Sequence, residues 1–406
     1  MSWKEGQLDF TGAQMVLTLK LVAIAICYQD GGRDNNDALR EYARSKQLDR
    51  LPTVIEFLSY LFAAGNLLSG PFFEAKDYFD FIQRRGDWAE VDNSNSNASD
   101  PKLHTKIPSA LGPGFYRFGK ALACAGVWMY FTKKGFTIDL LESRTWQHDT
   151  SLPTRIFLLW ATVVVYRMKY YFVWGVSEAA LIFSGLGFKR YTAEGKPLWN
   201  RYINSHIRGV EINPSLADTP RHWNICTGLW LRHYVYERLT PPHRKPSFLN
   251  MVVTQLVSGV WHGVFAGYWL FFITSAFMFQ ASRLVYKYEQ SWPVAVQSFP
   301  LWQALKIVCS ELILDYAGTS FMVLSLKEAW KVWSSVYFFG HGIVVAVLLI
   351  GAVMPPKRRG LGAVKGTAVV EVRDGEEHVT REGNRGEEGD PTAAANGGDA
   401  ATKKEN

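Results

Sequence analysis

The sequence has little cysteine, and its cysteines lie far apart. Cys27, Cys124, Cys226 and Cys309 are the four in 406 residues, and none belongs to a CxxC pair. Neither a disulfide framework nor a thiolate zinc site is therefore indicated. The histidines likewise form no HxxxH or HxxE pair with a suitable third ligand, so we expect no metal site.

Three further features are absent, and each argues against a class of protein or mechanism. No apolar signal segment opens the chain, because residues 1–12 carry Lys4, Glu5 and Asp9. The net charge of +7 comes from scattered lysines and arginines without an extended basic stripe, so we expect no nucleic acid as a partner. There is no G-x-S-x-G motif and no cysteine beside a histidine and an acid, so a covalent acyl-enzyme is not favoured.

Charged residues are missing from two long apolar runs, 247–282 and 332–356. Because about 20 apolar residues suffice to cross a bilayer as a helix, the first run is too long for one span. We expect a broken or paired helix there, interrupted near Gly259, Gly263 and Gly267. The second run has the length of one full span.

Five more apolar stretches carry charged residues, which are costly in a membrane unless they face a bundle interior or a wet cavity. Either these stretches surround a polar chamber, or some of them are amphipathic helices on the membrane surface. We expect an all-α polytopic membrane protein with six to eight membrane helices. The stretches are 13–27, 51–73, 114–131, 156–188 and 302–326.

The end of the chain differs from the rest in composition. Residues 355–406 contain almost no aromatic residues and are predicted to form a disordered tail after a membrane domain at 1–354. Three basic residues at 357–359 follow the last apolar run, which predicts a cytosolic C-terminus. The final KKEN has the spacing of a dilysine retrieval signal and predicts residence in the endoplasmic reticulum membrane. A glycosylation sequon begins at Asn97.

One histidine lies in the middle of the longest uncharged run. His262 is preceded by Trp261, followed by Gly263 and Gly267, and has Tyr268 nearby. A buried imidazole is costly without a partner, while the glycines leave room for a substrate to approach the ring. With an unperturbed pKa of about 6.5, an imidazole suits a general base that deprotonates an alcohol. His262 is therefore the catalytic candidate, and a satisfied core histidine is the alternative.

The residues around His262 fit a known signature. Residues 261–272, WHGVFAGYWLFF, match WHGxxxGYxxxF in full and resemble the membrane-bound O-acyltransferase (MBOAT) family. The block TPRHWNICTGLWLRHYVY resembles that of its lysophospholipid branch, where an asparagine after tryptophan is the second functional residue; here it is Asn224. The segments at 9–21 and 69–81 resemble fungal lysophospholipid acyltransferases. Since such members carry further helices before the first of these, the resemblance also implies that N-terminal spans are lacking.

The resemblance implies a helical bundle around a central tunnel and an enzyme of phospholipid synthesis and remodelling. It would transfer an acyl group from acyl-CoA, its co-substrate, to the free hydroxyl of a lysophospholipid, with no bound cofactor. His262 would take the hydroxyl proton. Asn224 would orient the imidazole or bind the oxyanion, unless it is only a helix cap or a loop amide. The residues expected to shape the tunnel are Trp223, Trp261, Gly263 and Tyr268.

Several alternatives stay open. Lys169 and Arg232 are candidate contacts for coenzyme A phosphates, although a solvated basic face explains them as well. Within the family, a protein or a neutral lipid is an alternative acceptor, but the FYxDWWN block of the sterol and diacylglycerol enzymes is absent. A transporter or an inactive membrane scaffold is the alternative from another class. The expected partners are acyl-CoA, a lysophospholipid and the lipid bilayer, and the oligomeric state is undetermined.

Overall fold

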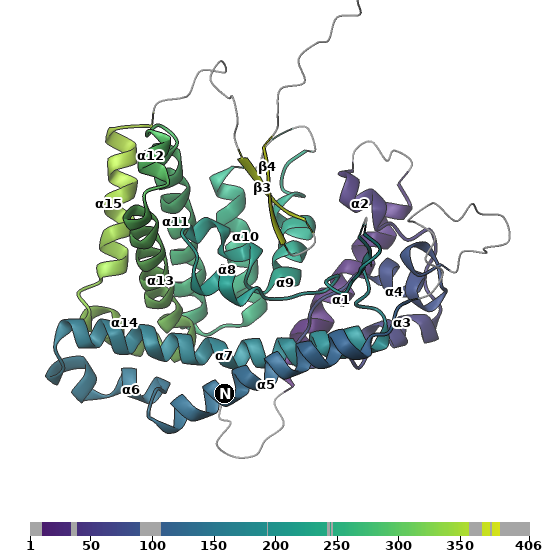
Figure 1. Cartoon of the computed structure of the whole chain (residues 1–406), viewed down its shortest axis with the longest axis horizontal. Helices are drawn as coiled ribbons and strands as arrows, with labels where there is room; N and C mark the ends of the chain where they lie inside the picture. Colours follow the sequence, from purple (N-terminus) through teal and green to yellow (C-terminus); the bar gives the residue numbers. More distant parts are fainter. Residues whose placement is uncertain are drawn as a thin grey trace, which may run out of the picture. The chain divides into compact units, whose positions relative to one another are not determined.

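The computed structural model describes residues 10–33, 39–89, 107–192, 194–241, 244 and 247–356, with the backbone of 368–373 and 376–381. Regular structure within these residues is helical apart from four short strands (Figure 1), which confirms the predicted all-α class. The helices are α1 (Thr11–Gly31), α2 (Glu41–Ser45), α3 (Val54–Leu61), α4 (Ala75–Ile82), η3 (Gly86–Trp88), α5 (Leu111–Lys133), α6 (Ile138–Glu142), η5 (Thr145–Asp149), α7 (Leu152–Ser184), α8 (Ile207–Glu211), η6 (Leu216–Arg221), α9 (Ile225–Trp230), η7 (Leu231–Tyr236), α10 (Phe248–His262), α11 (Ala266–Glu289), α12 (Val294–Gln297), α13 (Pro300–Val323), α14 (Leu326–Ser335) and α15 (Phe339–Val353).

The strands form two small antiparallel pairs. β1 (Arg190–Tyr191) pairs with β2 (Pro197–Leu198). β3 (Ala368–Arg373) pairs with β4 (Glu376–Arg381) in a separate unit formed by residues 358–406. The sequence predicted disorder for 355–406 and did not anticipate this second pair, although valine in AVVEVR favours strands. The rest of the tail after residue 356, including KKEN, and the Asn97 sequon lie outside the described residues.

Two of the described helices, α1 and α7, are long and apolar enough to cross a membrane. A third candidate is the pair α14 and α15, which is bent by 79°. Tyr337 and Phe338 form this bend in the left-handed region, with φ of 55° and 49°. The uncharged run 332–356 is therefore not one straight helix, and the single span predicted from its length is at most a broken one.

The number of candidate membrane spans is also lower than expected. By length and composition, the described part of the chain holds two or three candidate spans, against the six to eight expected. The stretch 51–73 contains only the eight-residue helix α3, which begins at a capping box of Thr53 and Glu56. Elsewhere the difference arises because α10 has only 15 residues and because α13 carries several charged side chains.

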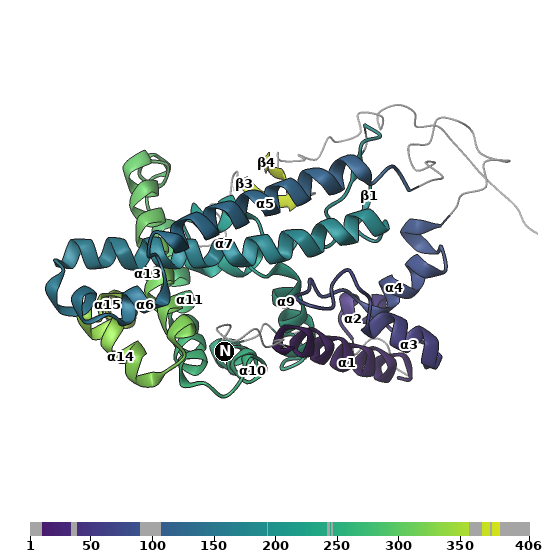
Figure 2. The same cartoon turned by 90° about the horizontal axis from the view of Figure 1, so that it is seen from below.

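The long helices pack in two groups. α5 and α7 lie side by side, and α11, α13 and α15 pack against one another (Figures 1 and 2). Since α7 also contacts α13, it joins the two groups. The break between α10 and α11 lies beside the second group, because α10 packs against α11.

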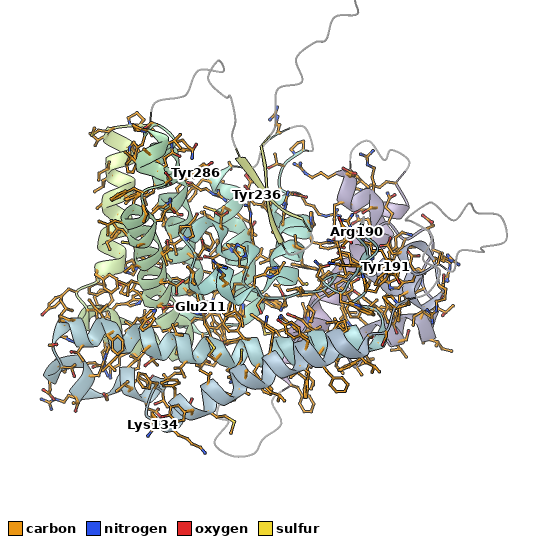
Figure 3. All side chains as sticks on the ribbon, viewed as in Figure 1. Lys134, Arg190, Tyr191, Glu211, Tyr236 and Tyr286 are labelled. Carbon is orange, nitrogen blue, oxygen red and sulfur yellow. The ribbon has the colours of Figure 1, made fainter. Side chains whose placement is uncertain are left out.

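The charge in the middle of α7 is buried and paired within the protein. Arg167 contacts the carboxylates of Glu211, Glu311 and Asp315, and of these Glu211 is labelled beside α7 in Figure 3. Buried charges cost several kcal/mol each unless they are paired and hydrogen-bonded. In the charged stretch at 156–188, the Arg167 side chain therefore faces the interior of the helical bundle rather than a membrane surface.

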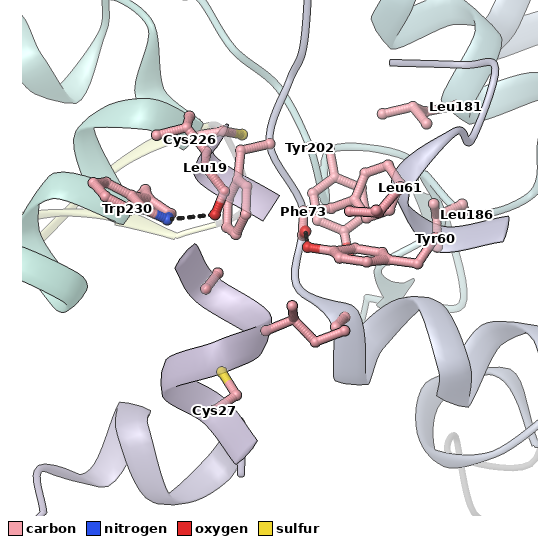
Figure 4. Packing of buried hydrophobic residues seen from close by; sticks show 14 of the residues in the cluster. Leu19, Cys27, Tyr60, Leu61, Phe73, Leu181, Leu186, Tyr202, Cys226 and Trp230 are labelled. Atoms are coloured by element: carbon pink, nitrogen blue, oxygen red, sulfur yellow. Dashed lines mark hydrogen bonds between the residues drawn. The ribbon is translucent and has the colours of Figure 1, made fainter. Parts of the chain in front are cut away.

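The first helix packs against the segment that follows Asn224. Its buried face includes Leu19 and Cys27, and the backbone oxygen of Leu19 accepts a hydrogen bond from Trp230 Nε1 of α9 at 3.1 Å (Figure 4). Cys27 Sγ lies 3.1 Å from the hydroxyl of Tyr234 in η7. Helix α1 is thus bonded to both α9 and η7.

A buried carboxylate also joins the N-terminal helices to η7. Glu74 is 3% exposed and accepts hydrogen bonds from the hydroxyls of Tyr42 and Tyr234 at 2.7 and 2.6 Å. Burial raises the pKa of its carboxyl group from 4.5 to about 7, although the two tyrosine bonds act in the opposite direction. The folded protein therefore holds a proton on Glu74 that the unfolded chain releases near pH 4.5.

Because the folded-state pKa of Glu74 is raised, its contribution to stability should fall as the pH rises from about 4.5 to 7. A shift of this size lowers the free energy of unfolding by roughly 3 kcal/mol between low and high pH, and this loss is complete above pH 7. We expect Glu74→Gln to remove this dependence of stability on pH. Relative to the wild type, the free energy of unfolding of the variant should therefore increase between pH 5 and 7.5. Thermal unfolding of both detergent-solubilised proteins across this range measures the difference, and parallel pH profiles would contradict the prediction.

Candidate active site

His262 is the last residue of α10 and lies at a break in the helix. Gly263 follows with φ of 126°, a conformation that favours glycine, and the chain becomes helical again at Ala266. The interruption predicted near Gly263 is thus confirmed. Its effect is to place the His262 side chain against the first turns of α11.

Four aromatic rings surround the His262 imidazole. Their centroids lie 4.7 Å (Trp261), 5.5 Å (Tyr268), 5.1 Å (Phe272) and 5.0 Å (Phe321) from its own. Within the part of the chain that the structure describes, neither imidazole nitrogen has a hydrogen-bond partner. A structural histidine in such surroundings is normally hydrogen-bonded to the protein. Among the described residues, no hydrogen bond thus satisfies the ring as expected for a core histidine, and its catalytic role stays a prediction.

Gly267 is needed for packing rather than to leave space beside His262. A Cβ atom on Gly267 would lie 2.1 Å from the backbone oxygen of Ser320, and its N–H donates to Leu324 O at 2.7 Å. The absence of a side chain lets α11 touch the end of α13. This close approach brings Phe321 of α13 onto the imidazole ring.

Trp261 connects the active-site helix to the start of the chain. Its indole N–H donates to the backbone oxygen of Met15 in α1 at 3.0 Å. Met15 is one helical turn before Leu19, which accepts the bond from Trp230. The two indoles therefore hold α9 and α10 to the same part of α1, and the role of Trp261 in a tunnel stays a prediction.

Asn224 occupies the N-cap position of α9 but does not cap that helix with its side chain. Its backbone is left-handed, with φ of 48° and ψ of 50°. Its Oδ1 accepts a hydrogen bond from Asn204 Nδ2 at 3.1 Å. Its own NH₂ group donates no hydrogen bond to any described residue. The helix-cap alternative thus fits the position of Asn224 but not the contacts of its amide.

Trp223 lies against α7, with its ring centroid 5.6, 5.6 and 4.8 Å from those of Tyr170, Tyr171 and Trp174. The residue before Asn224 is therefore packed into a cluster of aromatic rings on α7. No hydrogen bond joins the two candidate catalytic side chains within the described residues.

Similarity to known proteins identifies the family of this chain. Residues 1–309 match the family described as MBOAT, the membrane-bound O-acyltransferases. The chain belongs to the MBOAT family. It therefore belongs to a family of acyltransferases, as its signature at 261–272 indicated.

Named relatives come from plants, fungi and animals. The chain is 36% identical to lysophospholipid acyltransferase 2 of Arabidopsis thaliana over 359 residues, which cover 88% of this chain and 74% of the plant protein. It is 30% identical to the lysophospholipid acyltransferase of Schizosaccharomyces pombe over 84% of this chain and 66% of that protein. It is 30% identical to membrane-bound glycerophospholipid O-acyltransferase 2 of Gallus gallus, over 87% and 66% respectively.

The two candidate phosphate contacts of this MBOAT protein lie in different surroundings. The Lys169 ammonium lies 5.9 Å from the ring centroid of Trp128 and 5.8 Å from that of Tyr166, between α5 and α7. Arg232 is exposed in η7, two residues after α9 ends, and its Nε donates to Glu237 at 2.7 Å. Among the described residues, neither side chain forms a hydrogen bond or ion pair with His262 or Asn224, and the roles of both stay predictions.

The sequence-based candidates missed the residues that hold Asn224. Asn204 bonds to it directly, and the backbone N–H of Asn204 donates to Glu178 Oε1 at 2.8 Å. Glu178 is a buried residue of α7 and forms an ion pair with Arg117 of α5. A carboxylate within a largely apolar stretch was the available signal for Glu178. Nothing in the sequence alone linked Asn204 to Asn224.

Among the described residues, no group of three or more His, Cys, Asp or Glu side chains is arranged to hold a metal ion.

Proposed function

We propose that this chain transfers an acyl group from acyl-CoA to the free hydroxyl of a lysophospholipid. The named plant and fungal relatives support this acceptor class. The observation that carries the proposal is the state of His262 within the family signature. Its imidazole is enclosed by four aromatic rings and has no hydrogen-bond partner among the described residues, so it is available to a substrate hydroxyl.

In the proposed reaction, neutral His262 accepts the proton of the acceptor hydroxyl as its oxygen attacks the thioester carbonyl of acyl-CoA. The new C–O bond gives a tetrahedral oxyanion, which collapses as the C–S bond breaks. The proton held by His262 then passes to the departing thiolate of coenzyme A. General base catalysis of this kind contributes about 10²–10⁴-fold to the rate. No covalent intermediate with the protein is needed.

Asn224 would stabilise the oxyanion rather than orient the imidazole. Its Oδ1 is already bonded to Asn204, and no hydrogen bond joins its amide to His262. Its NH₂ group therefore remains as a neutral donor for the developing negative charge. A preorganised donor of this kind contributes about 3 kcal/mol to transition-state stabilisation.

The remaining parts of the proposal concern the surroundings of the two substrates. Trp223, Trp261, Gly263 and Tyr268 would line the path of the acyl chain, and Lys169 and Arg232 would meet the phosphates of coenzyme A. Exposure of the Arg232 side chain supports its proposed contact with a coenzyme A phosphate. We place the enzyme in the endoplasmic reticulum membrane with a cytosolic C-terminus. The basic residues at 357–359 and the final KKEN support this location.

An acceptor panel tests the proposed function. Membranes that contain the chain are given radiolabelled oleoyl-CoA with a lysophospholipid, diacylglycerol or a sterol. We expect labelled diacyl phospholipid at least tenfold above membranes that contain His262→Gln, and no labelled neutral lipid above that background. Label that enters only triacylglycerol or sterol ester would favour the neutral-lipid alternative and contradict the proposal. Absence of transfer from well-folded protein to every acceptor would favour an inactive scaffold.

A further inference from the structure

We propose that Asn204 is a positioning residue that caps α9 in place of Asn224 and thereby leaves the Asn224 NH₂ group free for the oxyanion. This inference rests on the function proposed above for Asn224. Asn204 lies 20 positions earlier in the chain, outside α9 and outside every motif identified in the sequence. It is 1% exposed, so its amide is held among protein atoms.

The first turn of α9 is capped by a residue from another segment. An N-cap asparagine normally accepts a hydrogen bond with its own side chain from an N–H group of the first turn. Asn224 makes no such bond. Instead, Asn204 Oδ1 accepts from Cys226 N at 3.0 Å, and the backbone oxygen of Asn204 accepts from Ile225 N at 2.9 Å. Asn204 thus satisfies the first two N–H groups of the helix.

The same side chain fixes which way the Asn224 amide faces. Because Asn204 Oδ1 accepts the hydrogen bond from Cys226 N, the NH₂ group of Asn204 faces Asn224 and donates to Asn224 Oδ1 at 3.1 Å. A donor at this point selects the oxygen of Asn224 and leaves the NH₂ end of its amide without a described partner. An acceptor in place of the Asn204 NH₂ group would select the opposite orientation.

Asn204 is itself held by two contacts. Its backbone N–H donates to the buried carboxylate of Glu178, which pairs with Arg117. The following residue, Ser205, forms an antiparallel bridge with Trp223, the residue before Asn224. The strand-like pairing and the ion pair place the two asparagines opposite each other. The left-handed backbone of Asn224, which asparagine tolerates better than most residues, completes the arrangement.

Asn204→Asp separates positioning from packing. Aspartate has nearly the same size and can still accept the hydrogen bond from Cys226 N, so α9 remains capped. It presents an acceptor to Asn224, whose amide should turn its NH₂ group toward the carboxylate and away from the substrate. We expect kcat to fall by about 10²-fold with KM changed less than threefold. The matched control is Asn213→Asp, because Asn213 is also buried and accepts from the backbone N–H of Ser215 at 2.9 Å.

A double-mutant cycle with Asn224→Gly gives the decisive readout, with folding checked by thermal unfolding of each purified protein. If Asn204 acts through Asn224, Asn204→Asp has no further effect on kcat once the Asn224 amide is removed. Multiplied losses in the double variant would overturn the inference, as would an Asn204→Asp enzyme as active as Asn213→Asp. If Asn224→Gly itself retains wild-type kcat, the role proposed for Asn224 fails, and the inference that depends on it fails with it.

Discussion

Replacing His262 with glutamine is expected to lower kcat for acyl transfer by roughly 10²–10⁴-fold, the usual contribution of a general base. Glutamine retains much of the volume of the ring and an amide group but cannot accept a proton at neutral pH. Because the four surrounding rings remain in place, we expect KM for both substrates to change little. Steady-state kinetics on purified, detergent-solubilised protein measure both parameters.

The control for this substitution is His148→Gln, which changes an exposed histidine of η5. It should leave kcat within a factor of two of the wild type. Thermal unfolding of both variants shows whether the loss in His262→Gln has a structural origin. A correctly folded His262→Gln enzyme with wild-type kcat would mean that another group removes the proton.

The second large effect is expected from Asn224→Gly. Removal of one oxyanion donor typically lowers kcat by about 10²–10³-fold. Glycine is the informative replacement because the backbone of Asn224 has φ of 48°, a region that glycine adopts without strain. The fold should therefore survive while the amide is lost, and the unfolding temperature should stay within a few degrees of the wild type.

Asn224→Ala provides the comparison for backbone strain. Alanine also lacks the amide but is disfavoured in the left-handed region by roughly 1–2 kcal/mol, so this variant should be less stable than Asn224→Gly. If the amide is what matters, the two variants lose activity to the same extent despite their different stabilities. Activity that follows stability instead would assign Asn224 a structural role.

The helix break at His262 was predictable because its causes are local in sequence. A run of 36 uncharged residues is too long for one span, and glycine at position 263 marks the point at which the helix stops. The residue types beside His262 likewise predicted its aromatic surroundings for Trp261 and Tyr268. Phe321 was not predictable, because it reaches the imidazole only through the packing of α13 against Gly267.

The bend between α14 and α15 could not be predicted from composition. The run 332–356 reads as one apolar helix, but Tyr337 and Phe338 adopt left-handed conformations that hydrophobicity alone does not indicate. The bend turns the chain so that Trp333 and His341 lie 4.7 Å apart between ring centroids. Tertiary contacts therefore override the local preference for a straight helix at this point.

The environment of Asn224 shows the same limit at the active site. Its position after a tryptophan in a family block identified it as a candidate, with a helix cap or a loop amide as the alternative. Its amide is instead bonded to Asn204, which is brought near by the bridge between Ser205 and Trp223. Contacts between residues about 20 positions apart depend on the fold and have no periodicity in the sequence. The free NH₂ group could thus be recognised only from the structure.

The role of His262 as the base is tested most directly by a single-turnover measurement with purified enzyme in excess over radiolabelled oleoyl-CoA and with saturating lysophospholipid. This isolates the chemical step from product release. We expect rapid appearance of labelled diacyl phospholipid with the wild-type chain and a rate at least 10²-fold lower with His262→Gln that still binds oleoyl-CoA. Equal single-turnover rates for the two proteins would contradict the assignment of His262 as the base.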